Sequence, residues 1–454
     1  MELKQDASTD IRGLDEHEAE RTSREDTKIS QSIFRHDHLD RRLERHHITG
    51  IAFSGAVGVG LFQTSGQVVA LGGQVGALLA FLFAALVVIS VMRSIAEMAS
   101  VRPVKGAVLD YPYTFVDEAL GFAVGLLYTL ANCMSMVTLT MAAAMFTQYW
   151  RPTLGLGSAT FVLLVAITLM NACGVRLYGN LEWCFKHIKI FLILFLCITM
   201  IAIKIGAGPK PVQSGSYTLA PGYTTNGFYK VNGTISTSPE AISKVAIAGT
   251  GGRILTVWTC ITIAIFQFLG GEMVLATAAE AKSPRRDIPV AARYMYLLPV
   301  TFYLVAVILV GLCVDYLDPL LPRQHLESTA AIDDRPAGVT TATASPFVIV
   351  IMRAGIGTLP SFFNAAFLFS ALTAANSALY VASRTLFFMA QNSGQKGIRD
   401  TVGRANNGYT PLAAILTCVI PGGLAFLVVK ASSKDFHEPS RPPIYRAIVV
   451  HMGK

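Results

Sequence analysis

A cluster of glycines inside an apolar segment is the part of this sequence best suited to binding a ligand. Residues 54–62 are Ser-Gly-Ala-Val-Gly-Val-Gly-Leu-Phe. Glycine costs about 1 kcal/mol relative to alanine inside a helix, so the cluster predicts a broken helix. The half-helix after the break would present N–H groups and a partial positive charge, which suit a carboxylate. Close packing of helices through small residues would explain the same glycines.

A second apolar segment carries a similar interruption. Residues 266–272 are Phe-Gln-Phe-Leu-Gly-Gly-Glu, with paired glycines followed by a carboxylate. Corresponding interruptions in two halves of a chain are the best indication in a sequence of a transporter binding site. The second break therefore favours binding over simple packing at both places. We expect Glu272 to hold the unwound backbone or to move a proton, and a plain buried hydrogen bond is the alternative.

Other polar side chains in apolar segments also need an explanation, because charges are costly inside a bilayer. Arg93 and Glu97 are four residues apart and can pair on one helical face, or Arg93 can snorkel to the nearby interface. Lys189 either snorkels or acts inside the membrane. A helical stripe of polar residues must face protein or water, and hydrogen bonding between helices is its simplest role. Its members are Ser370, Thr373, Asn376, Ser377 and Tyr380.

Nine apolar segments position these residues, and each has about the 20 residues that a membrane span needs. They are 48–70, 76–99, 119–149, 157–174, 187–206, 254–279, 294–314, 361–390 and 411–430. An apolar piece at 345–350 is too short to cross and predicts a re-entrant or surface helix. The sequence therefore predicts an all-α integral membrane protein.

Composition supports this class. The chain has 52% hydrophobic and 15% charged residues, whereas soluble domains have about 25% charged residues. The net charge of +8 comes from Lys and Arg in loops on one side of the predicted membrane, which places the N-terminus in the cytoplasm. Basic residues of this kind do not indicate nucleic-acid binding. The long loop after the fifth span is then extracytoplasmic, and it carries a glycosylation sequon at Asn232.

Three regions follow from this pattern. Residues 1–46 are polar and predict a disordered cytoplasmic tail, residues 47–430 form the membrane domain, and residues 431–454 form a polar tail. The seven cysteines are scattered and predict neither disulfides nor a metal site. No Rossmann, Walker, HExxH or GxSxG motif is present, so we expect no enzyme activity and no cofactor.

Five segments carry motifs that occur in order along the chain. They are RHHITGIAFSGAVGVGLFQTSG (45–66), AEMASVRPVKGA (96–107), TFVDEALGFAVG (114–125), FLGGEMVLATAAEAKSPRRDIPVAA (268–292) and NAAFLFSALTAANSALYVASRTLFF (364–388). Together they resemble the fungal amino-acid permeases of the amino acid–polyamine–organocation superfamily, over residues 48–430. The resemblance implies a LeuT-like fold of two inverted five-span repeats with discontinuous first and sixth spans. Of the usual twelve spans, about nine are present here.

The resemblance also implies a function and a site. It implies proton-coupled uptake of amino acids across the plasma membrane, with the bilayer and the amino acid as partners and the proton as coupling ion. Its substrate-binding positions here are Gly58, Val59 and Gly60 for the carboxylate and Phe266, Gln267, Phe268 and Leu269 for the ammonium, with Val57 and Gly270 as further substrate-binding positions. Phe266 matches a gating aromatic, and Lys189 matches a lysine that replaces a sodium ion. Glu272, Glu97 and Asn376 are further candidates for coupling or structural roles.

Several positions depart from the family pattern. Val59 and Gly271 replace threonines, Ala279 replaces a glycine, and residues 126–129 are Leu-Leu-Tyr-Thr where relatives often have Trp-Asn-Tyr-Trp. Binding through the backbone survives these changes, so the expected substrate is an amino acid of unspecified side chain. The match stops near Val429, so we expect a truncated form. A permease-like amino-acid sensor and a non-functional fragment are the alternative interpretations.

Overall fold

The structure is a computed structural model, and a defined set of residues is described. These are 42–101, 109–151, 154–210, 228–229, 246–247, 249–278, 280–314, 321, 345–405 and 410–423. Asn232, Ala279 and the predicted C-terminal tail lie outside them, as does most of the predicted N-terminal tail. The first helix begins at Arg45, two residues inside the region expected to be that tail.

Helices lie at all nine predicted spans. The span helices are α2 (Arg45–Ala56) with η1 (Val59–Leu61), α3 (Thr64–Val101), α5 (Glu118–Thr147), α6 (Leu156–Ala172), α7 (Val175–Ile205), α9 (Gly249–Gln267) with α10 (Met273–Ala276), α12 (Leu297–Cys313), α14 (Leu359–Gln391), and α16 (Leu412–Val419) with η7 (Ile420–Gly422). Within the described part of the chain, five helices are long and apolar enough to cross a membrane. The chain is a multi-pass membrane protein.

Short elements connect the spans. They are α4 (Asp110–Phe115), α11 (Pro284–Met295), α13 (Pro346–Arg353), α15 (Lys396–Thr401), and the antiparallel pair β1 (Phe228–Tyr229) and β2 (Ala246–Ile247). The short helix predicted at 345–350 is therefore present as α13. Its first six residues are buried, so it is not a surface helix.

Gly73 separates two helices within α3. It takes φ +68° and ψ −178°, which are not helical, so the chain kinks between the first two predicted spans. One predicted boundary was wrong, because the fifth span begins at Val175 rather than at residue 187. The added stretch includes an acidic residue, Glu182, which is completely buried and accepts a hydrogen bond from Asn376.

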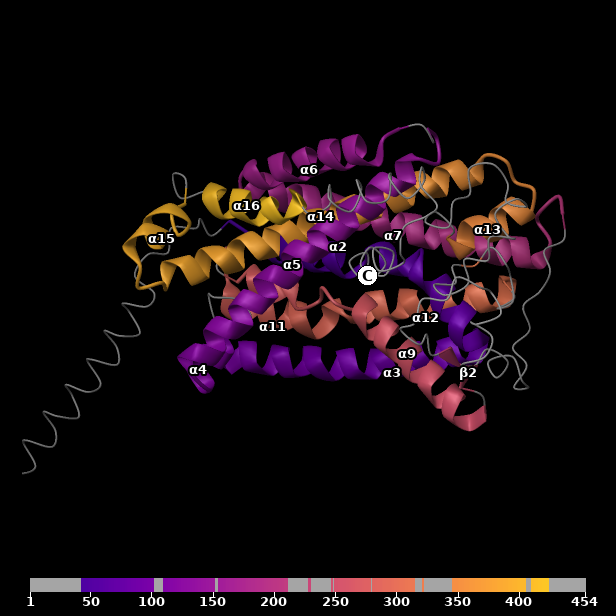
Figure 1. Ribbon diagram of the computed structural model, residues 1–454, viewed down its shortest axis with the longest axis horizontal. Coiled ribbons are helices and arrows are strands. Elements are labelled where there is room, and N and C mark those ends of the chain that lie inside the picture. Colours follow the sequence, from indigo (N-terminus) through magenta and orange to yellow (C-terminus); the bar gives the residue numbers. More distant parts are fainter. Residues whose placement is uncertain are drawn as a thin grey trace, which may run out of the picture.

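The helices form an elongated bundle. Helix α14 packs along α5, α3 packs along α9 and α12, and α2 packs along α7. Figure 1 shows α4 and α15 at one end of the long axis, and α13 and β2 at the other. Helices α4 and α15, which follow the second and eighth spans, therefore share one end of the bundle.

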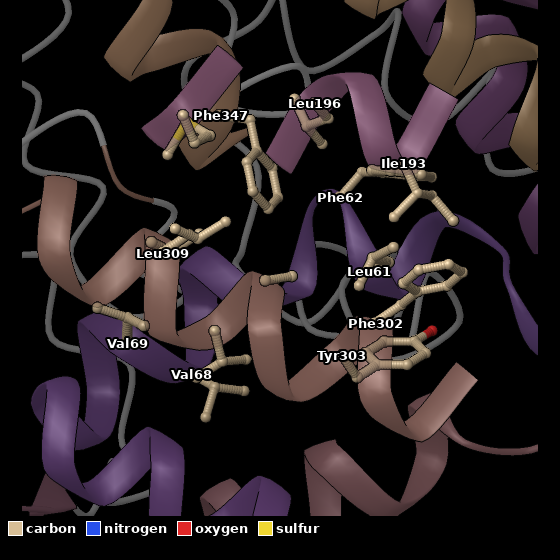
Figure 2. Packing of buried hydrophobic residues seen from close by; sticks show 14 of the residues in the cluster. Leu61, Phe62, Val68, Val69, Ile193, Leu196, Phe302, Tyr303, Leu309 and Phe347 are labelled. Atoms are coloured by element: carbon tan, nitrogen blue, oxygen red, sulfur yellow. The ribbon is translucent and has the colours of Figure 1, made fainter. Parts of the chain in front are cut away.

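The largest cluster of buried apolar residues surrounds the first glycine-rich segment. Figure 2 shows Leu61, Ile193 and Phe302 gathered between η1, α7 and α12, with Tyr303 beside them. Residues of α13, including Phe347, close the same cluster. This packing fixes η1 against three helices, so the interrupted backbone is held in a defined position.

Candidate substrate site between two broken helices

The first span is interrupted after Ala56. Helix α2 ends there, Gly58 has φ −111° and ψ −146°, and η1 starts at Val59. The N–H groups of Gly58 and Val59 donate to no described group. Gly58 also lies close to α14, since an added Cβ would be 3.3 Å from the Cβ of Ala374. The break therefore presents free donors at a position where a larger side chain has little room.

The sixth span is interrupted between Gln267 and Met273, and it touches the first break. Gly270 takes φ +119°, and a Cβ added there would lie 2.7 Å from the carbonyl carbon of Gly55. The Glu272 carboxylate accepts the Gly270 N–H at 2.8 Å, so it holds the unwound turn. The carbonyls of Phe268 and Leu269 accept no hydrogen bond from the described residues. The first break thus leaves free donors, the second leaves free acceptors, and the two breaks are in contact at Gly55 and Gly270.

Tyr303 of α12 joins the two breaks. Its hydroxyl donates to the carbonyl of Gln267 at 3.0 Å and lies 3.5 Å from the carbonyl of Ala56. The Gln267 side chain packs against Gly60, where an added Cβ would be 3.0 Å from Oε1. Both polar atoms of this carboxamide are buried and meet no partner among the described groups. They offer one donor and one acceptor to a polar ligand.

Lys189 supports the first break from α7. The side chain is 1% exposed, so it does not snorkel to an interface. Its ammonium donates to the carbonyls of Ser54 and Val57, each at 2.8 Å. Ser370 of α14 also donates to the Val57 carbonyl, at 3.2 Å. A positive charge suits this position because the C-terminal carbonyls of a helix carry a partial negative charge.

The polar stripe on α14 faces other helices. All five of its predicted members are buried. Asn376 donates to Oε1 of Glu182 at 2.6 Å and accepts from Asn171 of α6 at 2.8 Å. The stripe thus connects α14 to α2, α6 and α7.

A buried ion pair joins the end of the sixth span to α14, and sequence reasoning did not find it. Arg384 donates to Glu280 at 3.1 Å, and both side chains are fully buried. Tyr380 also donates to Glu280, and the Arg384 guanidinium lies 4.0 Å from the centre of the Tyr380 ring. Tyr380 in turn stacks on Tyr178 of α7, with ring centres 4.6 Å apart.

The segment before the first span is fastened to the segment after the sixth. Leu43 exchanges backbone hydrogen bonds with Glu280 and Lys282. Lys282 donates to Glu44 at 2.5 Å, and this contact holds the pKa of the Glu44 carboxyl below its usual value. Arg45 pairs with Asp287 of α11 at 3.0 Å. These contacts lie at the end of the bundle where α11 begins.

The side chains of three predicted residues are exposed rather than buried in this cluster. Phe266 is 66% exposed and Leu269 is half exposed, whereas Phe268 is buried against Tyr303. Glu97 is exposed on α3, and its expected partner Arg93 donates instead to the Tyr296 hydroxyl at 3.3 Å. Among the described residues, no group of His, Cys, Asp or Glu side chains is arranged to hold a metal ion.

A hydrophobic helical bundle whose polar groups converge on two interrupted helices defines a membrane transporter. Residues 47–436 match the amino acid permease family, and the chain belongs to that family.

Two relatives illustrate the match. The chain is 31% identical to the dicarboxylic amino acid permease of Saccharomyces cerevisiae, over 87% of this chain and 60% of that one. It is also 31% identical to the histidine permease HisP of Lactococcus lactis, over 86% of this chain and 73% of that one. This chain therefore spans less than two-thirds of the length of the yeast relative.

A solved structure shares the fold. A manganese transporter variant from Eremococcus coleocola superposes with a TM-score of 0.50 at 14% identity, covering 90% of this chain and 75% of that one. The predicted all-α, LeuT-like transporter fold with discontinuous first and sixth spans is confirmed.

We expect Gly270→Ala to prevent stable folding, because its Cβ would collide with the backbone of the first break and its φ is positive. Gly174→Ala is a matched control, since Gly174 also has positive φ but has open space around it. That strain alone costs roughly 1–3 kcal/mol. Melting temperatures of detergent-solubilised variants measure the effect. Equal losses in the two variants would show that the breaks do not touch.

We expect Arg384→Met to destabilise the protein by roughly 3–5 kcal/mol, because the Glu280 carboxylate would remain buried without its cation. The double variant Glu280→Gln/Arg384→Met should recover part of this loss, since no charge is left unpaired. Arg399→Met in α15 is the control, because Arg399 is half exposed and its carboxylate partner is 3.9 Å away. Thermal unfolding of the purified single variant, double variant and control variant measures these effects. A double variant as unstable as the single one would contradict this account.

Proposed function

We propose that this chain transports amino acids across a membrane by alternating access around the two broken helices. The observation that carries the proposal is the contact between the breaks, where Gly270 lies against Gly55. The first break leaves N–H groups without described partners, and the second leaves carbonyl groups without described partners. An amino acid in its zwitterionic form is complementary to such a pair. Membership of the amino acid permease family supports the same substrate class.

The substrate main chain would be held by backbone groups. Its carboxylate would accept the N–H groups of Gly58 and Val59, at the positive end of the helix that follows the break. Its ammonium would donate to the free carbonyls of Phe268 and Leu269. The Gln267 carboxamide would then contact the substrate side chain, because its two polar atoms have no partner in the described part of the chain.

Proton coupling would act through Lys189. Its ammonium holds the last carbonyls of α2 at 2.8 Å, where an inorganic cation would serve the same purpose. Loss of the proton would remove this charge and release the end of α2. A ligand or ion shifts a conformational equilibrium only through a difference in its interactions with the two states, and this contact offers such a difference.

We further propose a plasma-membrane location with a cytoplasmic N-terminus. Helices α11 and α15, which carry Lys and Arg residues, lie toward one end of the bundle (Figure 1). The bias of basic residues toward the cytoplasm supports that end as the inner one.

Uptake of radiolabelled amino acids by a transport-deficient yeast tests the function. We expect uptake by the chain and at least a tenfold loss in Gly58→Leu, because the side chain would occupy the space for the substrate carboxylate. Gly357→Ala is the control, since nothing lies within 4 Å of a Cβ added there. Surface expression of the unmodified chain and of both variants must be equal. Binding without uptake would instead favour a sensor, and full uptake by Gly58→Leu would exclude the proposed carboxylate site.

The pH dependence of uptake tests the coupling residue separately. We expect Lys189→Ala to transport with a flat pH profile between about pH 5 and 8, because no group at this position would then gain or lose a proton. Initial rates at a series of external pH values measure this, with Lys186→Ala on the same helix as the control. A Lys189→Ala profile that follows the wild type would exclude Lys189 as the coupling group.

A further inference from the structure

Glu182 is a buried carboxylate that the proposed transport mechanism does not yet use. It lies on α7 and is completely inaccessible. Asn376 donates to its Oε1 at 2.6 Å, whereas its Oε2 is buried and meets no hydrogen-bond partner among the described residues. A buried carboxylate oxygen in this state is costly if it is charged. It is therefore a natural acceptor for a proton.

Lys189 lies on the same face of α7, seven residues further along. This spacing is two helical turns, or about 10 Å along the axis. The two side chains form no direct ion pair, because the Lys189 ammonium binds the carbonyls of Ser54 and Val57 instead. A buried base and a buried acid are thus held near one another without being neutralised by contact.

Ser54 of α2 lies between them. Its carbonyl accepts from Lys189, and its side chain is close enough to Glu182 to influence the carboxylate. The Ser54 hydroxyl oxygen is itself buried without a hydrogen-bond partner in the described part of the chain. A hydroxyl both accepts and donates, so it can take a proton from an ammonium and give one to a carboxylate oxygen.

The surroundings leave few other groups to exchange a proton with Glu182. From α7 these are the Tyr178 hydroxyl and Lys189. From α2 the neighbour is Ser54, and from α14 it is Asn376, neither of which ionises. The next charges, Glu280 and Arg384, lie beyond the stacked rings of Tyr178 and Tyr380 and bind each other.

We propose that Glu182 is a second proton site that exchanges a proton with Lys189 through the Ser54 hydroxyl. The Lys189 ammonium gives a proton to Ser54 Oγ while the Ser54 hydroxyl proton passes to Glu182 Oε2. The N–H and O–H bonds that break are matched by the O–H bonds that form, and no electrons are transferred. The products are a neutral amine and a neutral carboxylic acid, so the buried net charge stays at zero. This inference rests on the proposed proton coupling and adds the group that stores the proton.

The consequence for transport is mechanical. When Glu182 holds the proton, Lys189 is neutral and loses its charge-assisted hydrogen bonds to the carbonyls of Ser54 and Val57. The last turn of α2 is then free to move relative to α7. Glu182 also lies closer to the N-terminal end of α7, where His47 meets Asn180 at 2.7 Å. The proton therefore advances toward that end of the bundle as the break loosens.

Reconstituted full-length protein in liposomes tests this with Glu182→Gln, which keeps an acceptor for Asn376 but cannot take up a proton. We expect exchange of labelled for unlabelled amino acid to persist, while accumulation driven by a pH gradient falls at least tenfold and exchange loses its pH dependence. Ser54→Ala should likewise keep exchange and lose accumulation, and Ser54→Thr should restore accumulation. Glu118→Gln, an exposed carboxylate at the start of α5, is the matched control.

The outcomes separate the two proposals. Wild-type protein that exchanges but does not accumulate amino acid in a pH gradient overturns proton coupling and this inference with it. Wild-type accumulation that persists in Glu182→Gln with an unchanged pH profile overturns this inference alone. If Glu182→Gln does not yield monodisperse protein, accumulation by Ser54→Ala decides whether the relay operates. Full accumulation by Ser54→Ala overturns the relay, and loss that Ser54→Thr restores supports it.

Discussion

The structure depends on how the bilayer constrains an interrupted helix. Backbone groups freed at a break must find partners in protein or in a wet cavity, because lipid offers none. Here Lys189 and Ser370 satisfy carbonyls at the end of α2, and Tyr303 and Glu272 satisfy groups of the sixth span. Backbone groups of both breaks remain without partners among the described residues. The same set of contacts therefore stabilises the fold and leaves polar backbone free at both breaks.

Gly270 makes the contact between the breaks possible, because any larger residue there would meet the backbone of Gly55. The aromatic side chains that precede it are sorted by helical geometry. Residues two apart on a helix lie about 200° apart around its axis, so Phe268 packs on Tyr303 while Phe266 lies on the exposed face of α9 that includes Trp258. The last turn of α9 therefore decides which aromatic side chain is buried at the sixth-span break.

Much of this arrangement was predictable from glycine spacing and from the cost of buried charge. The two breaks and the buried stripe on α14 follow from residue types and from the 3.6-residue period, whereas residue types left the position of Lys189 open and the resemblance to the permeases indicated it. Tyr303, Glu182 and the Glu280–Arg384 pair did not follow, because their roles depend on partners that are 36 to 194 residues away. The predicted fifth span even started after Glu182, at residue 187, whereas α7 starts at Val175. A single signal was available for it, namely its spacing of two turns before Lys189.

In the proposed mechanism, Ser54 connects substrate and proton in one short segment. Its carbonyl accepts a hydrogen bond from the Lys189 ammonium, and four residues later the N–H of Gly58 donates to no described group. A change in the charge on Lys189 and the arrival of a carboxylate at Gly58 would therefore act on the same end of α2. Binding free energies that act on one element are reciprocal. A proton that loosened this end would in turn bind with an affinity that depends on whether substrate is present, without any longer chain of contacts between the two.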